Sequence, residues 1–204
     1  MSWMSFPALE ALSGFAHRFT LRHPEIDVDA ERAVVVERLW AWHHEQAAEL
    51  GFKDTALCIA EQVHGCEVAL VESPQSETAP GADGIISNVP GLVVGIYVAD
   101  CCAVYLADDR TGAFGVVHSG KKGSELGITA RAIERMRQCY GTSPADLVVQ
   151  LSPCIRPPAY EIDFAAQIRQ QALDTGVPAG QVHDSGVCTS SDLRRFYSYR
   201  MEKG

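Results

Sequence analysis

Seven short apolar runs separated by turn residues occupy the middle of the chain, and they limit its possible folds more than any other feature. Six of them lie between two segments with helical periodicity and one follows the second segment: ALCIA, EVALV, GIIS, LVVGIYVA, AVYLA, AFGVVH and LVVQL. Glycine, proline and aspartate separate the runs, as is typical of strands joined by turns. The run LVVGIYVA is apolar at nearly every position, which favours a strand buried on both faces. So many strands between so few helices predict an α+β fold, with sheet packed on sheet or in layers, rather than regular βαβ alternation.

Three segments have the apolar periodicity of an α-helix. Residues 29–50 and 124–140 form the longer two, and Ser124 is the expected N-cap of the second. A shorter helix is expected to begin near Asp163. The side chains expected to face the core are Val36, Leu39, Trp40, His43, Ala47 and Leu50, then Leu126, Ala130, Ile133, Met136 and Tyr140, then Phe164, Ile168 and Ala172. We interpret the polar stretch 72–81 as a surface loop, and because nothing else resembles a linker we predict one domain over residues 1–204.

The charge balance limits the partners that we expect. The chain has 17 lysines and arginines against 26 aspartates and glutamates, a formal net charge of −9, and no basic cluster. Duplex nucleic acid and anionic membranes are therefore poor partners, because binding them requires clustered positive charge. Hydrophobic residues make up 47% of the chain, which provides enough apolar surface to offset the entropy lost on folding.

Cysteine usage and the apolar segments favour a reducing, cytoplasmic location. The seven cysteines are odd in number and have no regular spacing, which argues against a secreted disulfide framework. No basic residue precedes the first apolar residues, so no signal peptide is expected. The longest apolar stretch, residues 91–99, is shorter than the roughly 20 residues that a membrane-spanning helix needs.

Three polar side chains stand at the ends of predicted strands, where loops commonly carry function. They are His64 in EQVHG, Cys101 in the ADCC sequence, and His118 in VVHSGKKG. Imidazole and thiolate bind zinc, and a catalytic zinc site keeps one position open, so one interpretation is a three-ligand zinc site. Without metal, the same residues could form a cysteine nucleophile activated by histidine. The third interpretation is three ordinary strand-end residues, since the chain has no CxxC or HxxxH spacing.

The sequence after His118 favours anion binding. Residues 120–123 combine glycine amides, two lysines and the start of a predicted helix, although the spacing is not that of a P-loop. The alternative is an ordinary turn with solvated lysines. Arg22 could be a second binder of phosphate or carboxylate, or a surface residue. Glu161 precedes the third helix, where a carboxylate can simply complement the helix dipole.

Taken together, several short motifs resemble one protein family. They occur in the order QVHG, ADG, ADC, HSGKKG, YEI and FYSYR. Their order and spacing are similar to those of the YfiH-like laccase-domain proteins, also called multicopper polyphenol oxidase proteins and now regarded as purine nucleoside phosphorylases. The resemblance runs from about Phe15 to Arg200 and is strongest between Gln62 and Gly123.

This resemblance implies a layered α/β/β/α fold and a metal or catalytic trio at His64, Cys101 and His118. It also implies zinc, nucleoside substrates, phosphorolysis of adenosine, inosine and methylthioadenosine, and adenosine deamination. The laccase name itself fits poorly, because a multicopper oxidase holds its coppers with about ten histidines, largely in HxH pairs. This chain has seven histidines and no HxH, so zinc is favoured over copper.

The chain also departs from the family pattern. Ser119, Lys121 and Lys122 stand where the family usually has alanine, tryptophan and arginine, so a bidentate guanidinium and an aromatic wall are lost. Ala103 follows an extra cysteine, Cys102, where a proline is usual after ADC, and the SLNLG segment has no counterpart. These departures concern the substrate and the rate rather than the fold.

Three functional hypotheses remain open. The first is a zinc-linked purine nucleoside phosphorylase, with or without adenosine deaminase activity, whose partners are a nucleoside and phosphate and which is a monomer or a homodimer. In it, Asp100 would orient a ligand histidine or contact the ribose. The second is a metal-free hydrolase with Cys101 as nucleophile and His118 or His64 as base, and the third is a degenerate nucleoside- or zinc-binding module. The residues that the first hypothesis assigns to phosphate and substrate are Lys122, Gly120 with its neighbouring amides, Arg22, Asp100 and Glu161.

Overall fold

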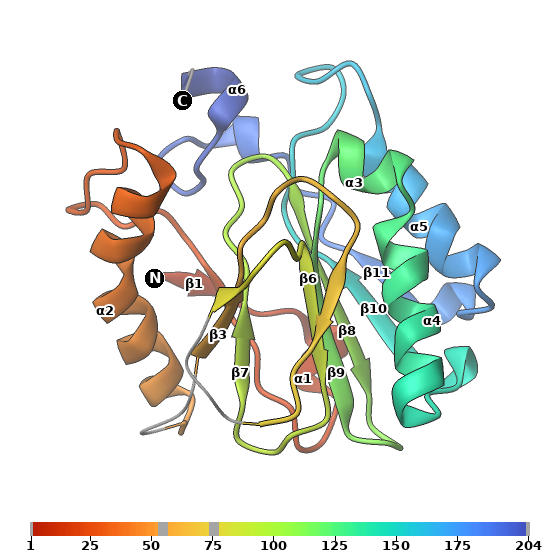
Figure 1. Ribbon diagram of the computed structural model, residues 1–204. Helices are drawn as coiled ribbons and strands as arrows, with labels where there is room; N and C mark the ends of the chain where they lie inside the picture. The colour runs from red at the N-terminus through yellow and green to blue at the C-terminus, as the bar shows by residue number, and fades with distance from the viewer. Residues whose placement is uncertain (1, 53–56, 74–77, 203–204) are drawn as a thin grey trace.

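Two β-sheets packed face to face form the centre of the molecule (Figure 1). The computed structural model describes residues 2–52, 57–73 and 78–202. The larger sheet has six strands in the order β11-β10-β8-β9-β6-β4, the smaller has three in the order β5-β3-β7, and β1 and β2 form a separate ribbon. In chain order the strands are β1 (Trp3–Met4), β2 (Phe19–Thr20), β3 (Leu57–Ala60), β4 (Val68–Leu70), β5 (Thr78–Ala79), β6 (Gly84–Ser87), β7 (Val93–Gly95), β8 (Cys102–Asp108), β9 (Ala113–Ser119), β10 (Leu147–Leu151) and β11 (Val182–Asp184).

Helices lie on both sides of the paired sheets. The long helix α2 lies on the side of the smaller sheet, and α3, α4 and α5 lie on the opposite side, against the larger sheet (Figure 1). The helices are α1 (Pro7–Glu10), α2 (Arg32–Glu49), α3 (Lys121–Glu125), α4 (Ile128–Tyr140), α5 (Phe164–Asp174) and α6 (Tyr199–Glu202), with 3₁₀ turns at Pro144–Asp146, Ala179–Gln181 and Thr189–Ser191. This arrangement confirms the layered α/β/β/α fold.

Alternation along the strands divides the core into layers. In β8, Cys102, Val104 and Leu106 face α4 and α5, where they pack in the largest hydrophobic cluster. A second cluster, which includes Ala60 of β3 and Ile85 of β6, fills the space between the two sheets. Because the large sheet is covered on both faces, its strands have the nearly continuous apolar sequences noted above.

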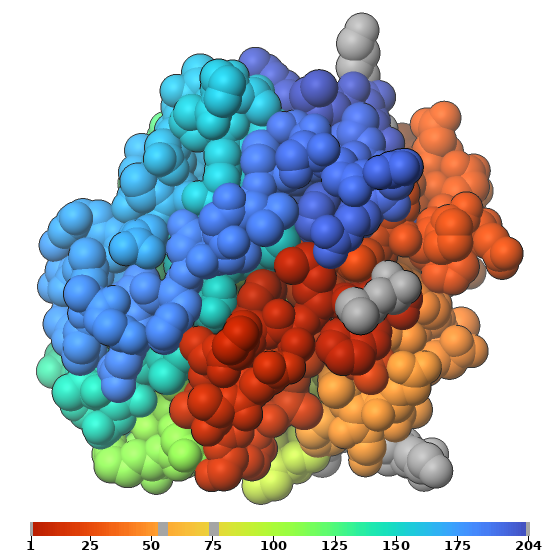
Figure 2. Space-filling view, turned by 180° about the vertical axis from the view of Figure 1, so that it is seen from behind, coloured from red at the N-terminus to blue at the C-terminus, as the bar shows by residue number. Residues whose placement is uncertain are grey.

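The N-terminal segment covers the part of the large sheet that the small sheet leaves open. Phe6, Leu9 and Phe19 pack against Ala107 of β8 and Val148 of β10. Figure 2 shows this segment in red, running between the C-terminal segment in blue and the α2 region in orange. The first strands of the chain thus close the core rather than extend the main sheet.

The helix predicted over residues 124–140 is two helices. α3 ends at Glu125 and α4 begins at Ile128, because Gly127 adopts the left-handed conformation with φ of 74° and interrupts the helix. The prediction of Ser124 as an N-cap is therefore wrong, since Ser124 lies inside α3 and its hydroxyl donates to the carbonyl of Lys121 at 2.8 Å. The third helix begins after Asp163 and buries Phe164, as predicted.

Other elements differ from the prediction in extent. The run LVVGIYVA forms only the three-residue strand β7, and its side chains are half-buried because β7 is an edge strand of the smaller sheet. Trp42 and Gln46, rather than Trp40 and His43, lie on the buried face of α2 with Leu39 and Ala47. The apolar runs did not predict strands β1, β5 and β11, whereas β2 lies in the short strand-like stretch before Arg22. Within the expected loop 72–81, residues 74–77 lie outside the described part, and Thr78–Ala79 forms β5.

Six of the cysteines are free thiols: Cys66, Cys101, Cys102, Cys139, Cys154 and Cys188. In the described ranges, none of the helices combines the length and the apolar character needed to cross a bilayer.

Candidate metal site

The side chains of His64, Cys101 and His118 converge, and one ligand atom from each lies within 4.8 Å of the ligand atoms of the other two. His118 is the penultimate residue of β9, Cys101 directly precedes β8, and His64 lies in the turn after β3. The structure therefore brings together the three residues that the sequence singled out. His118 is buried, Cys101 is half-buried and His64 is exposed, so the cluster opens to solvent on the His64 side.

Strand pairing places two of these side chains on one face of the large sheet. Ala103 of β8 pairs with His118 of β9, and Cys102 pairs with Ser119. Because side chains alternate along a strand, Cys101 points to the same face as Ala103 and His118. Cys102 points to the opposite face, where it is fully buried in the helical core, so it does not share the site.

Gly120 makes room for the Cys101 thiol. A Cβ atom at position 120 would lie 2.3 Å from Cys101 Sγ, closer than any real contact. The glycine in HSGKKG is therefore required by the packing of the thiol, independently of any role in binding anions.

Asp83, in the ADG motif directly before β6, connects two of the three ligands. Its side chain is fully buried, and its carboxylate accepts hydrogen bonds from the backbone N–H of His64 at 2.9 Å and of Gly65 at 2.6 Å. Its Oδ1 is also 2.9 Å from Nδ1 of His118. Because an ionised carboxylate only accepts, Nδ1 of His118 carries the proton and Nε2 is left to face a metal. Sequence analysis missed this residue as a site residue, although its motif was noted.

The electrostatics of Asp83 agree with this role. Burial by itself raises the pKa of the Asp83 carboxyl, but the hydrogen bonds from His118, Gly65 and His64 outweigh burial, and the pKa is lowered overall. The carboxylate thus stays ionised at neutral pH in a buried position. The same bonds hold the turn in which Gln62 and His64 adopt left-handed conformations, with φ of 63° and 59°.

The Cys101 thiol and the His64 imidazole are both uncharged at neutral pH. Burial, helped by the negative charge of Asp100, raises the pKa of the Cys101 thiol to about 12. Burial and the neighbouring His118 lower the pKa of His64, and the positive charges of Lys122 and Arg32 lower it further. A neutral imidazole is ready to bind a metal, whereas a thiol with such a pKa is a poor free nucleophile.

The donor set fits a zinc-type ion. With Zn–N of about 2.0–2.1 Å and Zn–S of about 2.3 Å, tetrahedral ligand atoms lie about 3.3–3.7 Å apart, so the cluster needs to close by about 1.5 Å at most. Two imidazoles and one thiolate leave a fourth position, on the exposed side of His64. Within the described residues, no second group of three such donors lies this close together.

The carboxylate of Asp100 does not contact either histidine. It accepts hydrogen bonds from Oγ1 of Thr189 at 2.6 Å and from the backbone N–H of Arg200 at 2.7 Å, while its own φ is 82°. Of the two roles expected for Asp100, orienting a ligand histidine falls to Asp83 instead, and contact with the ribose stays a prediction. Asp100 ties the Cys101 loop to the C-terminal segment.

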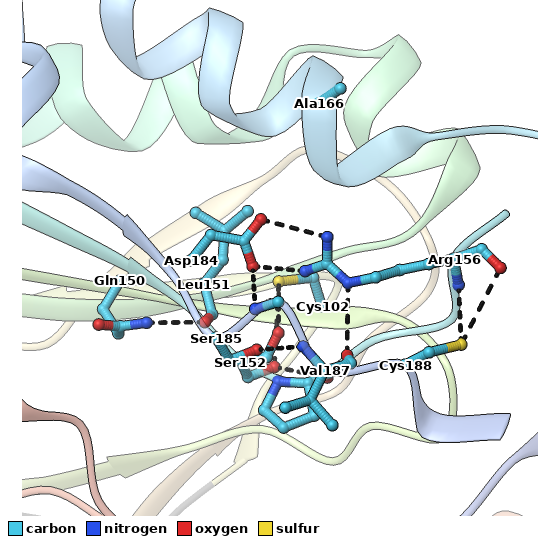
Figure 3. Close-up of polar contacts among 12 residues, drawn as sticks. Cys102, Gln150, Leu151, Ser152, Arg156, Ala166, Asp184, Ser185, Val187 and Cys188 are labelled. Atoms are coloured by element: carbon cyan, nitrogen blue, oxygen red, sulfur yellow. Dashed lines mark hydrogen bonds and ion pairs between the residues drawn. The ribbon is translucent and has the colours of Figure 1, made fainter. Parts of the chain in front are cut away.

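Further polar contacts fix the segments that hold Asp100, and Figure 3 shows those of Arg156 with Asp184 and Val187. The backbone N–H of Ile155 donates to the carbonyl of Asp100 at 2.8 Å. The next residue, Arg156, pairs with Asp184 of β11 and donates from Nε to the carbonyl of Val187 at 3.3 Å. These contacts join the two segments that hold Asp100 in place.

Two other predicted site residues are engaged in ion pairs. Arg22 pairs with Glu202, donates to the carbonyl of Phe196 at 3.2 Å and stacks on the ring of Tyr197 at 4.4 Å. Glu161 pairs with Arg200 at 3.2 Å, and both side chains are exposed. The structure does not bring either residue into contact with the His–Cys–His cluster.

A cavity of about 1810 Å³ adjoins the cluster. His64 and Cys101 line it together with Asp100, Lys122 and Tyr160, and it extends between α2 and the smaller sheet. The structure moves Lys121 and Lys122 from the predicted loop into the first turn of α3, directly after Gly120. The open side of the cluster thus faces a space large enough for an organic substrate.

The structure thus defines an α+β protein of layered α/β/β/α fold, with a His–Cys–His cluster that could hold a metal ion beside a large cavity. The chain belongs to the family described as multi-copper polyphenol oxidoreductase laccase, whose model matches residues 28–166 and 160–204.

Known relatives agree with this membership. A protein of Xylella fastidiosa named purine nucleoside phosphorylase is 31% identical over 175 residues, covering 70% of this chain and 66% of the relative. One of Deinococcus radiodurans with the same name is 31% identical over 183 residues, covering 78% and 70%. The chain thus spans just under two thirds of the length of the Xylella relative, and 58% of a relative from Mycobacterium bovis.

Solved structures show the same fold. YlmD from Geobacillus stearothermophilus superposes with a TM-score of 0.85 at 22% identity, covering 100% of this chain and 92% of that one. YfiH from Bacillus licheniformis gives 0.78 at 21% identity, covering 92% and 87%.

Proposed function

We propose that this chain is a zinc-linked purine nucleoside phosphorylase. The observation that carries the proposal is the cluster of His64, Cys101 and His118, with its open side on the cavity. The names of the relatives support the substrate class and the reaction. The reaction joins a phosphate oxygen to C1′ of the ribose and breaks the bond from C1′ to the purine nitrogen, whose electron pair leaves with the base and takes up a proton.

His64, Cys101 and His118 would hold the metal. Bound zinc supplies a positive charge that polarises a substrate atom or lowers the pKa of water. Asp83 fixes the tautomer of His118 and the position of His64, and Gly120 leaves space for the thiol. The two imidazoles and one thiolate favour zinc over copper as the native ion.

Phosphate would be held next to this cluster by Lys122 and by the backbone amides that begin at Gly120. Of these residues, Lys122 lines the cavity and lies in the first turn of α3. Arg22 would first have to leave Glu202, so its predicted part in phosphate binding is secondary. Glu161 would contribute to the wall of the cavity only through Arg200, with which it forms an ion pair.

The metal-free hydrolase is the weaker candidate. A nucleophilic Cys101 needs a thiolate at neutral pH, and burial raises the pKa of this thiol to about 12. We further propose that the protein acts in the cytoplasm as one domain over residues 1–204, as a monomer or homodimer. Free thiols and an acidic net charge support this location.

A turnover assay followed by mass spectrometry tests the proposal. Zinc-loaded protein is incubated with phosphate and with adenosine, inosine, guanosine or methylthioadenosine, and free base with ribose 1-phosphate is the expected product. His118→Ala should abolish product and zinc binding, whereas His183→Ala, on the edge strand β11, should retain both. Inosine from adenosine without free base would show deamination instead, and zinc-bound protein that binds nucleosides without turnover would show a degenerate binding module.

A further inference from the structure

His64 is the member of the cluster whose position the paired strands β8 and β9 do not determine. His118 lies within β9 and Cys101 directly precedes β8, so antiparallel pairing of these two strands places both side chains. His64 lies instead in the turn between β3 and β4, and it is the exposed member of the cluster. A ligand binds a metal tightly when its position is held before the metal arrives, so other contacts have to hold this turn.

The side chain of Gln62 makes such contacts. Gln62 is buried, with 8% of its surface exposed, and it lies two residues before His64 in the same turn. Its Nε2 donates to the carbonyl of Tyr97 at 2.5 Å, and its Oε1 accepts from the backbone N–H of Tyr97 at 2.8 Å. These two bonds tie the His64 turn to the segment that follows β7.

The same two bonds extend the pairing of β3 with β7 beyond the ends of both strands. β3 and β7 lie side by side and pair in parallel, and the last residues in register are Ile59 and Gly95 (Figure 1). Beyond them, the planar side-chain amide of Gln62 takes the place of a backbone peptide and pairs with Tyr97, two residues after β7 ends. The turn that carries His64 is thereby fixed to the smaller sheet.

The backbone of Gln62 is held by a different segment. Its N–H donates to the carbonyl of Ala82 at 2.8 Å. The next residue, Asp83, accepts from the N–H groups of His64 and Gly65. Gln62 has a left-handed conformation that is unfavourable for a residue with a Cβ atom, so it persists only because contacts on both sides hold the turn.

The oxygen of the Gln62 side chain is saturated by these contacts. Oε1 also accepts from Nη2 of Arg32, the first residue of α2, at 3.1 Å, so each of its two lone pairs has a donor. These partners fix the orientation of the amide, because a reversed amide would point its NH₂ group at two donors. Gln62 lines the cavity, yet its oxygen is already engaged, which favours a role in positioning over one in substrate binding.

We propose that Gln62 is the positioning residue for His64, and that its side-chain amide holds the exposed imidazole where it completes a zinc site with Cys101 and His118. The inference rests on the zinc site of the proposed function. Loss of a group that orients a metal ligand typically weakens metal binding about 10–100-fold. Gln62 thus determines zinc affinity in the folded protein, beyond any contribution to stability.

The test compares Gln62→Ala with the control Gln46→Ala. Gln46 is similarly buried, with 7% exposed, and its Oε1 accepts from Nη1 of Arg18 at 3.0 Å, but it lies near the C-terminal end of α2. Competition with a chelator should show a zinc affinity about tenfold lower in Gln62→Ala and within twofold of wild type in Gln46→Ala. An unchanged affinity in Gln62→Ala, or an equal loss in the control, would overturn the inference.

Gln62→Gly separates positioning from backbone strain. Glycine takes the left-handed conformation without penalty, so Gln62→Gly should be more stable in urea than Gln62→Ala, and it serves as the test variant if Gln62→Ala does not fold. Its zinc affinity should still be about tenfold below that of wild type, because the amide is missing. Wild-type affinity in Gln62→Gly would show that only the strain matters and would overturn the inference.

A double-mutant cycle with His64→Ala identifies the residue through which Gln62 acts. If Gln62 positions His64, adding Gln62→Ala to His64→Ala should change the zinc affinity less than twofold, whereas an additive loss would overturn the inference. In zinc-free protein, amide hydrogen exchange at His64 and Gly65 should be faster in Gln62→Ala and unchanged in Gln46→Ala. Unchanged exchange in Gln62→Ala would contradict the proposed hold on the turn.

Nucleoside turnover distinguishes this inference from the proposed function. If zinc-loaded wild type turns over no nucleoside, the phosphorylase is refuted, and a lower zinc affinity in Gln62→Ala would still support the inference. If wild type carries out phosphorolysis but Gln62→Ala binds zinc as wild type does, the inference alone is overturned. Wild type that binds no zinc would overturn the inference and the metal site together.

Discussion

Replacing Asp83 by asparagine should weaken both the folding and the metal binding of this protein. The Asp83 carboxylate receives three hydrogen bonds, two at Oδ1 and one at Oδ2, in a fully buried position. Asparagine has nearly the same shape but only one acceptor oxygen. In either orientation of the amide, its NH₂ group faces at least one N–H donor, of Gly65 in one case and of His64 and His118 in the other.

The size of the effect follows from these contacts. A buried donor left without an acceptor costs about 1–3 kcal/mol, so the free energy of unfolding should fall by about that amount in Asp83→Asn. Loss of a carboxylate that orients a ligand histidine typically weakens metal binding about 10–100-fold. Because the pKa of Asp83 is lowered in the folded state, its carboxylate stabilises the fold fully above the ordinary pKa of 3.8, and this contribution is lost as the pH falls below that value.

Asp108→Asn is the matched control. Asp108 is also fully buried in the same sheet and accepts from the backbone N–H of Arg110 at 2.9 Å and the hydroxyl of Thr111 at 2.6 Å, but it lies at the other end of β8. Urea unfolding should show a loss of stability in both variants. Competition with a chelator of known affinity should show weaker zinc binding in Asp83→Asn alone. Equal zinc affinity in the two variants would refute the role of Asp83 in orienting the ligands.

Three further predictions concern the site and its surroundings. In protein stripped of metal, iodoacetamide at pH 7.5 should alkylate the exposed Cys139 well before Cys101, because the pKa of the Cys101 thiol is raised to about 12. Peptide mapping that finds Cys101 modified first would contradict this prediction. Gly120→Ala should weaken zinc binding at least about tenfold because its Cβ displaces the Cys101 thiol, whereas Gly180→Ala, with open space around its Cβ, should leave chelator competition unchanged. Burial lowers the pKa of His43 to about 4, so protonation of the unfolded chain should reduce wild-type stability by about 3 kcal/mol between pH 6.5 and pH 4. His43→Gln should show a flatter pH dependence in urea unfolding, and an unchanged slope would argue against a neutral buried imidazole.

Local pattern was enough to predict five of the six strands of the large sheet, all except β11, and the ligands near the strand ends. β8 and β9 are apolar at nearly every position because the sheet is covered on both faces, so the polar residues that end these runs stand out. Cys101 and His118 are such residues, and antiparallel pairing of two consecutive strands brings their ends together. The fold class followed from the number of strands between the helices.

The contacts that complete the site depend on register between distant segments. Asp83 meets His118 across the pair β6–β9, and no local signal in the sequence specifies which residues of two strands face one another. Arg22 forms an ion pair with Glu202, near the other end of the chain. The sequence around Arg22 does not indicate that a distant carboxylate neutralises its charge. The interruption of the helix at Gly127 was not predicted, because the apolar residues keep their helical spacing on both sides of this glycine.

The histidines of this chain also bear on the family description as a laccase. Five of the seven lie outside the cluster: His17, His23, His43, His44 and His183. His17 accepts from the backbone N–H of Phe6 at 2.8 Å and stacks on its ring, and His23 and His43 pack against Trp42, so these three have structural contacts of their own. A multicopper centre needs several ions held mostly by imidazole, whereas the one donor group among the described residues combines two imidazoles with a thiolate. Family membership therefore defines the fold and the position of the site, and the chemistry has to be argued from the donors that stand there.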